Sequence, residues 1–205
     1  MKLDHIVWAS NSLDSAAAQF AELSGVVAGA GGSHPGIGSR NALANLENDI
    51  YLAIDGPDPR QALEGNYGAF LNGLPSPVLW RFAVQTPDLD AARAMLARRG
   101  YETGVKHGGR NGAGGERLEW DTLSVADHDL GAGLPIIKSW HTSAHPSASA
   151  PSGCRLLELT VFHPAAAELR SLYADLGLDL KVAEAAEPAL KVILEGRKGK
   201  FSLSS

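Results

Sequence analysis

A glycine-rich block holds the densest group of side chains that could bind a charged ligand. It spans Gly31–Leu43, reads GGSHPGIGSRNAL, and contains His34, Arg40 and Asn41. Glycine allows positive φ and a close approach of the backbone, which exposes N–H groups to an anion. Arg40 could bind a carboxylate or phosphate through two hydrogen bonds, Asn41 could add a neutral one, and His34 could transfer a proton or ligate a metal. Alternatively, the glycines only shape a turn that Arg40 braces.

A second group of candidates lies on strand-like segments. His5 stands among apolar residues and could transfer a proton if its ring faces a ligand; otherwise a buried partner satisfies it. Asp4 is expected to point to the opposite face and so not to orient His5, because successive side chains alternate along a strand. Arg81 could hold an anion, and Arg110 begins a loop that could close over one. Trp120 could stack on a planar substrate or belong to the core.

These side chains would be positioned by a unit of one strand and one helix that occurs three times. The three copies recur at nearly constant spacing, at Leu3–Val26, Leu79–Gly100 and Leu156–Gly177. Each begins with a run rich in β-branched and aromatic residues and continues with apolar residues at helical spacing, up to a glycine. The pattern indicates duplication of a small module.

The repeats predict an α+β fold with a curled sheet. The modules span about 1–58, 78–141 and 154–205, and the first two fit a β-α-β-β-β order. Such a module has one apolar sheet face to cover, so two of them side by side would form a cup-shaped mixed sheet with a ligand pocket. The third is a related repeat that contains a strand and a helix. We therefore predict a single domain over residues 1–205.

Three connecting segments are predicted between the strands. Arg60–Leu74 is expected to form a helix, which the following glycine and prolines end. Gly108–Gly115 is predicted to be a flexible loop and Ser143–Gly153 a linker over the surface, because small and turn-forming residues dominate both.

The composition narrows the class of protein. A chain of 205 residues with 44% hydrophobic residues can bury a full core. The net charge of −5, without a basic stripe, argues against nucleic acid as a partner. No signal peptide precedes Leu3 and no apolar run approaches the roughly 20 residues of a membrane span, so we expect a cytoplasmic protein without a membrane partner. The single cysteine, Cys154, fits a reducing compartment and is expected to be buried.

Several motifs together resemble the glyoxalase-like branch of the vicinal oxygen chelate superfamily. They are LDHIVWA in the first strand, the GGSHPGIGSRNAL block, the YLAI strand, and GLPIIKSW followed by AHPS. The resemblance covers most of the chain and implies paired β-α-β-β-β modules around a cup. It also implies lyase, isomerase, dioxygenase or ring-opening hydrolase chemistry, usually with a divalent metal held by His, Glu or Gln. Some members only bind and sequester ligands.

The metal ligands that the resemblance implies are incomplete in this sequence. The family position in the first strand is His5, which would be the protein ligand of a metal. The fourth strand commonly supplies a glutamate, but here Ala53 takes its place. The matching position of the second module is Arg81, which stays protonated and cannot ligate a metal. A divalent cofactor is therefore an open expectation.

Two functions are predicted as alternatives. The first is a lyase- or isomerase-type proton transfer on a small anionic or carbonyl-containing metabolite, and the second is metal-free binding or sequestration of such a molecule. The residues assigned to the site are His5 and His34 as catalytic residues, and Arg40, Asn41, Arg81, Arg110 and Trp120 as substrate-binding residues. A third reading is an interaction module in which the third repeat covers an exposed sheet. Modules of this kind can also pair between chains, which allows a homodimer.

Overall fold

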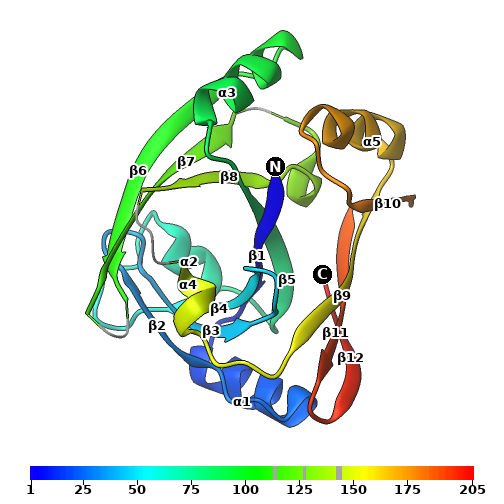
Figure 1. Ribbon diagram of the computed structural model, residues 1–205. Coiled ribbons are helices and arrows are strands. Elements are labelled where there is room, and N and C mark those ends of the chain that lie inside the picture. Colours follow the sequence, from blue (N-terminus) through cyan, green and yellow to red (C-terminus); the bar gives the residue numbers. More distant parts are fainter. Residues whose placement is uncertain (113–114, 127, 142–144) are drawn as a thin grey trace.

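The structure, a computed structural model, describes residues 1–112, 115–126, 128–141 and 145–205 (Figure 1). The first unit and the helix after it comprise β1 (Lys2–Ala9), α1 (Leu13–Ser24), β2 (Gly29–His34), β3 (Ser39–Asn45), β4 (Tyr51–Pro57) and α2 (Tyr67–Asn72). The second unit comprises β5 (Val78–Gln85), α3 (Leu89–Arg98), β6 (Thr103–Asn111), β7 (Arg117–Val125), the short η1 (Gly131–Gly133) and β8 (Ile136–Trp140). The third follows α4 (Pro146–Ser149) and comprises β9 (Arg155–His163), α5 (Ala166–Asp175), β10 (Lys181–Glu184), β11 (Ala189–Gly196) and β12 (Gly199–Ser204).

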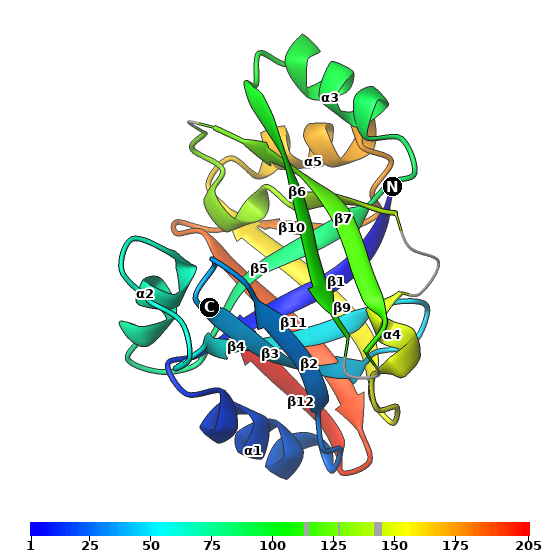
Figure 2. The same ribbon diagram turned by 90° about the vertical axis from the view of Figure 1, so that its left-hand side faces the viewer.

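The strands of the first two units form one eight-stranded sheet in the order β2-β3-β4-β1-β5-β8-β7-β6. In each unit the last strand runs parallel to the first, and β1 and β5 join the two units in antiparallel fashion. The sheet curls until its edge strands β2 and β6 meet, as Figure 2 shows. Arg110 of β6 spans this seam and donates a hydrogen bond to the carbonyl oxygen of Gly31. The predicted cup of paired β-α-β-β-β modules is confirmed.

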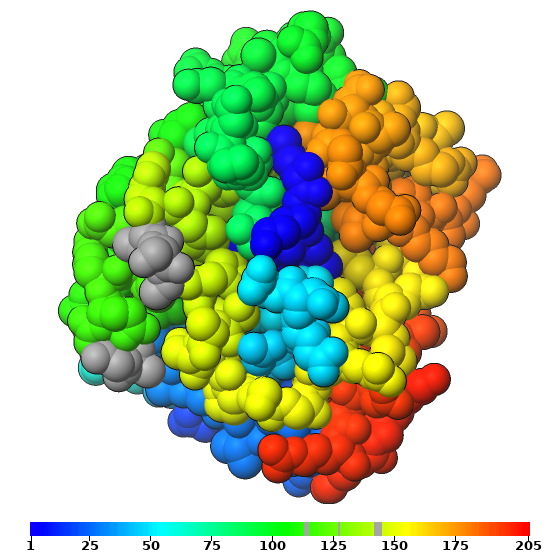
Figure 3. All heavy atoms as spheres, in the orientation of Figure 1, coloured from blue at the N-terminus to red at the C-terminus, as the bar shows by residue number. Residues whose placement is uncertain are grey.

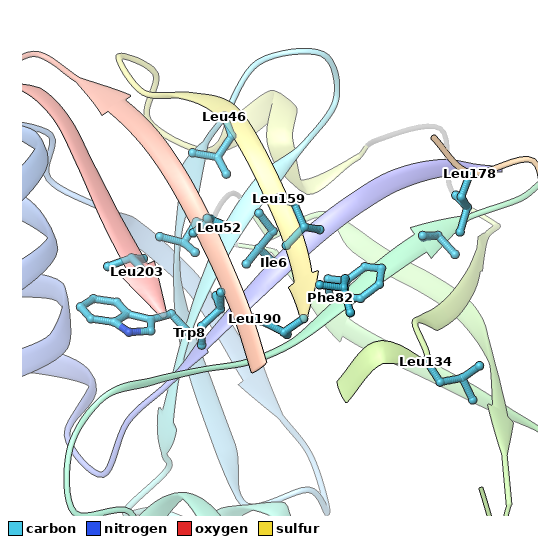
Figure 4. Packing of buried hydrophobic residues seen from close by; sticks show 14 of the residues in the cluster. Ile6, Trp8, Leu46, Leu52, Phe82, Leu134, Leu159, Leu178, Leu190 and Leu203 are labelled. Carbon is cyan, nitrogen blue, oxygen red and sulfur yellow. The ribbon is translucent and has the colours of Figure 1, made fainter. Parts of the chain in front are cut away.

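The third unit forms a separate four-stranded sheet in the order β10-β9-β11-β12, which covers the outer face of the cup. One cluster of buried apolar side chains fills the space between the two sheets (Figure 4). Ile6 and Trp8 of β1 belong to this cluster, as do Leu159 of β9 and Leu190 of β11. The two sheets therefore share a core, and the expectation of a related third repeat is confirmed.

Because one core joins both sheets, we expect the whole chain to unfold as a single unit. Leu190 is 1% exposed, so a Leu190→Ala change leaves a cavity and should lower the free energy of unfolding by about 3 kcal/mol. The tryptophans lie in the eight-stranded sheet, whereas far-UV circular dichroism reports on both sheets. The midpoint of urea unfolding should shift by the same amount with both probes. If the midpoint from tryptophan fluorescence did not move, the third unit would unfold alone.

The predicted flexible loop at Gly108–Gly115 is wrong for its first half, since β6 continues to Asn111. The glycine at position 108 serves close packing, because a Cβ there would lie 2.6 Å from the indole of Trp120. Residues 113–114 of the predicted loop lie outside the described ranges. A glycine pair in a strand pattern can therefore mark an aromatic neighbour instead of flexibility.

The predicted helix at Arg60–Leu74 is much shorter in the structure, where only Tyr67–Asn72 is helical. Asn66 caps it by accepting a hydrogen bond from the backbone N–H of Ala69. Gly65 just before the cap has φ of 70°, a left-handed conformation that prevents a helix from continuing through it.

The predicted surface linker at Ser143–Gly153 packs against the sheet. Residues 143–144 lie outside the described ranges, but α4 and the residues after it lie beside the end of β3. The N–H of Asn45 donates to the carbonyl oxygen of Pro151 at 2.9 Å. In Figure 3 this yellow segment surrounds the cyan turn between β3 and β4. Cys154 is buried and free, as predicted. No helix in the described ranges is long and apolar enough to cross a lipid bilayer.

Candidate functional site

The concave face of the eight-stranded sheet encloses a cavity of about 780 Å³. Strand alternation decides which side chains line it. On β1, His5 and Val7 line the cavity, whereas Ile6 and Trp8 face the core between the sheets. The same pattern that builds the core therefore presents polar side chains to the inside of the cup.

Asp4 and His5 form the most deeply buried polar pair of the cup. The Asp4 side chain is 0% exposed and accepts hydrogen bonds from Nδ1 of His5, from Nε1 of Trp140 at 2.7 Å and from Nε2 of His145 at 3.0 Å. Burial alone raises the pKa of Asp4, but these hydrogen bonds together hold that pKa far below its usual range. As a carboxylate Asp4 can only accept, so Nδ1 of His5 carries the proton and Nε2 keeps its lone pair.

The prediction that Asp4 cannot orient His5 is wrong, because β1 contains a bulge. Leu3 pairs with Val84 and His5 pairs with the next residue, Ala83, which leaves Asp4 as an extra residue in β1. A bulge interrupts the alternation of side chains, so neighbouring residues can turn to the same side.

His5 is placed to act as a base. Its ring stacks on Tyr51 with centroids 4.7 Å apart, and the histidine lines the cavity. Among the residues that the structure describes, none hydrogen-bonds to Nε2. Burial lowers the pKa of His5 even though Asp4 opposes the shift, so the ring is neutral at pH 7.

Lys138 and Arg110 both face the cavity, and neither has a carboxylate partner among the described residues. Nζ of Lys138 lies 4.5 Å from the ring centroid of Trp120 and 5.1 Å from that of Trp140. Burial lowers the pKa of Lys138 to about 8. Arg110 is 5% exposed, and its guanidinium donates to the carbonyl oxygens of Gly31 and Asn111. Uncompensated positive charge of this kind favours an anionic ligand.

Two further titratable residues line the same cavity, His34 of the glycine-rich block and Asp55 of β4. Nδ1 of His34 lies 3.0 Å from Oγ of Ser39, and burial, with the nearby Arg110, lowers the pKa of His34 to about 3. Asp55 on β4 accepts a hydrogen bond from the hydroxyl of Tyr67 at 3.2 Å, and burial raises the pKa of Asp55 to about 6. His34 is therefore neutral at pH 7, whereas the pKa of Asp55 lies close to neutral pH.

The structure brings together nearly all of the predicted site residues. Those that line the cavity are His5, His34, Asn41, Arg81, Arg110 and Trp120. Arg40 does not line it, because Ser39 and Asn41 on either side face the cavity and Arg40 points away from it. Its Nη2 instead lies 3.3 Å from the Asp14 carboxylate on α1.

Sequence reasoning missed Lys138 and His145. Lys138 could have been found, because Ile136, Lys138 and Trp140 occupy one face of a strand and a lysine on a largely apolar face is unusual. His145 gave no such signal. It follows the undescribed residues 142–144, and its contact with Asp4 joins positions far apart in the chain.

The side chains around the cup do not fit the metal that relatives of this superfamily bind. Ala53 and Arg81 both line the cavity, and neither can ligate a metal. Lys138, which also lines the cavity, would repel a cation. In the described part of the chain, metal-ligating side chains gather in threes only at His107, Asp121 and His141. His141 contacts Asp121, whereas His145 contacts Asp4.

The paired units and their curled sheet are those of the vicinal oxygen chelate fold. The chain belongs to the glyoxalase-like domain family, whose model matches residues 3–177. The predicted family is therefore confirmed. Among curated proteins, none matches the chain.

Solved structures are similar to the chain at low sequence identity. A hypothetical protein from Staphylococcus aureus has a TM-score of 0.67 and 16% identity, and the match covers 98% of this chain and 84% of that one. The methylmalonyl-CoA epimerase of Streptomyces coelicolor, in complex with 2-nitronate-propionyl-CoA, has a TM-score of 0.49 and 21% identity over 70% of this chain and 99% of that one. The Mycobacterium tuberculosis methylmalonyl-CoA epimerase has a TM-score of 0.47 and 21% identity over 72% and 92% of the chains.

Proposed function

We propose that the cup is the active site of an enzyme that moves a proton next to a carbonyl group in a small anionic substrate. One observation carries the proposal. The buried Asp4–His5 pair leaves Nε2 of His5 available to a cavity that also contains the cations Lys138 and Arg110. A base beside uncompensated positive charge is the arrangement that formation of an enolate requires.

In the proposed reaction, Nε2 of His5 takes a proton from the carbon next to the carbonyl group. The electron pair of that C–H bond moves to the carbonyl oxygen, and Lys138 and Arg110 stabilise the negative charge. Asp4 stabilises the imidazolium that forms, because it accepts the hydrogen bond from Nδ1. Return of the proton to carbon gives an isomerase, and expulsion of a leaving group from the next carbon gives a lyase.

The cavity indicates what kind of substrate would fit. Its volume of about 780 Å³ is in the range of small-molecule sites. Aromatic side chains, among them Trp80, Trp120 and Trp140, line it beside the cations. We therefore propose an anion with an apolar part. A cytoplasmic location and a homodimer remain predictions from the sequence.

The second candidate is a protein that binds such a molecule without changing it. The observation that favours it is the number of contacts that Asp4 makes, since hydrogen bonds from His5, Trp140 and His145 tie β1 to β8 and to the start of α4. A network of this kind also serves a purely structural purpose.

Hydrogen–deuterium exchange at carbon separates the two candidates. The probes are phenylpyruvate and 2-oxobutyrate in deuterated buffer, with exchange next to the carbonyl followed by proton NMR. A His5→Gln change removes the base, so the rate of catalysed exchange should fall by at least about a hundredfold. His163→Gln is the matched control, because this histidine of β9 neither lines the cavity nor belongs to the Asp4 network.

The outcomes decide between the candidates when binding is measured in parallel by calorimetry. Exchange that depends on His5 and not on His163 supports the enzyme. Binding of either probe without exchange supports the sequestering protein, and exchange that survives His5→Gln overturns the role of His5. Failure of both probes to bind would contradict the proposed ligand class.

A further inference from the structure

Three potential metal ligands meet on the wall of the cup that β6, β7 and β8 form, where His107 borders the cavity and Asp121 and His141 do not. Nδ1 of His107 lies 3.0 Å from one oxygen of Asp121, and Nε2 of His141 lies 2.9 Å from the other. The ligand atoms of the three side chains all lie within 4.8 Å of one another. Two imidazoles and a carboxylate are thus gathered around one point.

The backbone of the sheet places these three side chains together. His107 of β6 and Asp121 of β7 are directly paired across the antiparallel ladder. The N–H of His141 donates to the carbonyl oxygen of Glu119 at 2.9 Å, which extends the pairing of β8 with β7 by one residue. The cluster is therefore fixed by main-chain hydrogen bonds, and only side-chain rotations remain to be adjusted.

Strand alternation turns two of the three ligands, Asp121 and His141, away from the cavity, whereas His107 lies at its wall. Trp120 and Trp140 face the inside of the cup, so Asp121 and His141, which follow them, turn to the outside. The carboxylate and His141 are not part of the cavity wall. A ligand bound at Asp121 would lie behind the wall that presents Trp120, Trp140 and Lys138.

We propose that His107, Asp121 and His141 bind a divalent transition metal, with zinc the preferred ion. Imidazole nitrogen and carboxylate oxygen suit zinc, nickel and cobalt better than magnesium or calcium, which favour all-oxygen ligands. The metal takes the place of the protons now shared between each histidine and Asp121. Three protein ligands leave at least one position for water.

The metal would stiffen one wall of the cup. It would tie β6, β7 and the end of β8 together through His107, Asp121 and His141. The inward side chains of β7 and β8 place the Lys138 ammonium beside the indoles of Trp120 and Trp140, so metal binding would support the same wall. A metal that binds the folded chain and not the unfolded chain also raises the melting temperature.

Zinc chloride titrated into the metal-free protein tests the proposal, with calorimetry for affinity and differential scanning fluorimetry for the melting temperature. Asp121→Asn keeps the shape of the side chain but removes the charged ligand, so the affinity should fall by more than about tenfold. His107→Gln is the second variant. Glu119→Gln is the matched control, because it removes the same charge two residues away on β7, from a side chain that pairs with Arg117 and is not one of the three ligands.

The expected result is one zinc ion bound per chain, a melting temperature that rises with zinc but not with magnesium, and loss of both effects in Asp121→Asn and His107→Gln only. Circular dichroism confirms that each variant is folded. Equal zinc affinity in Asp121→Asn and the natural protein would overturn the site. Loss of zinc binding in His5→Gln, with none in Asp121→Asn, would place the metal in the cup and overturn it as well.

Discussion

A Lys138→Met protein is expected to be more stable than the natural protein and to bind anions more weakly. Lys138 is an ammonium group inside the cavity, with two indole rings around it and no salt bridge among the described residues. Methionine has a similar length and no charge, so it can fill the same space without desolvating an ion. The two effects have opposite signs, which a general loss of structure could not produce.

The size of the gain in stability follows from the pKa of Lys138. Burial lowers it from 10.5 to about 8, and each unit corresponds to about 1.4 kcal/mol, so burial of the charged form costs about 3 kcal/mol. Between pH 8 and about 10.5 the unfolded chain keeps the proton that the folded chain has lost. The natural protein should therefore become more stable as the pH rises through this window, and the advantage of Lys138→Met should shrink.

Urea unfolding at pH 7 and pH 9.5 measures the stability, and fluorescence of bound 1-anilinonaphthalene-8-sulfonate measures affinity for an apolar anion. We expect a gain of about 3 kcal/mol at pH 7 and a loss of affinity of roughly a hundredfold. Lys191→Met is the matched control, because Lys191 is an exposed lysine on β11 and should change the stability by less than about 0.5 kcal/mol.

Destabilisation of Lys138→Met at pH 7 would contradict this account, because it would mean that the ammonium is stabilised by the two indoles more than burial penalises it. Unchanged affinity for the sulfonate would mean that Arg110 alone holds the anion. A stability gain that persists unchanged at pH 9.5 would show that packing, and not charge, produced it.

The sequence was sufficient to predict the cup and most of its lining. Alternation along β1 separates His5 and Val7 from Ile6 and Trp8, and this local pattern is what the folded sheet preserves. The same rule could have placed Arg40 on the outside, since it lies between Ser39 and Asn41. The glycine-rich composition made Arg40 a candidate, but the alternation of side chains along β3 determines that it points away from the cavity.

The parts that could not be predicted depend on contacts between distant segments. The bulge at Asp4 depends on how β1 pairs with β5, and a single strand carries no sign of its partner's register. His145 reaches Asp4 only because α4 packs beside the end of β3. A helical reading of Arg60–Leu74 failed because Gly65 adopts a left-handed conformation that its sequence neighbours do not require.

Two buried ionisable groups of the cup do not stabilise the fold in their charged forms. Lys138 has a lowered pKa and Asp55 a raised one, both because of burial, so each opposes folding in its charged form. Asp4 is the exception, since its partners stabilise the ionised form. Buried groups whose charged forms oppose folding are concentrated at functional sites, which supports the site proposed in the cup.

An Asp4→Asn protein is expected to lose about 4 kcal/mol of its free energy of unfolding, because a buried ion is removed from partners that all donate to it. The amide has one oxygen to accept hydrogen bonds, so N–H groups of His5, Trp140 and His145 compete for it. At least one of them stays unsatisfied in a buried place. The same change frees His5 to adopt the other tautomer.

The pH dependence of this loss distinguishes the carboxylate from the shape of the side chain. Hydrogen bonds from His5, His145 and Trp140 hold the pKa of Asp4 far below its unfolded value of about 3.9, although burial opposes them. The stabilisation by Asp4 is therefore fully present above pH 5 and is lost as the pH falls below about 4. The free energies of unfolding of the natural protein and Asp4→Asn, measured in urea, should differ most at neutral pH and converge under acid.

Asp49→Asn, which removes an exposed carboxylate paired with Lys2, should cost less than about 1 kcal/mol and serves as the control. If Asp4→Asn lost no more than Asp49→Asn, the carboxylate would not be the group that fixes His5, and the proposed base would lose its support.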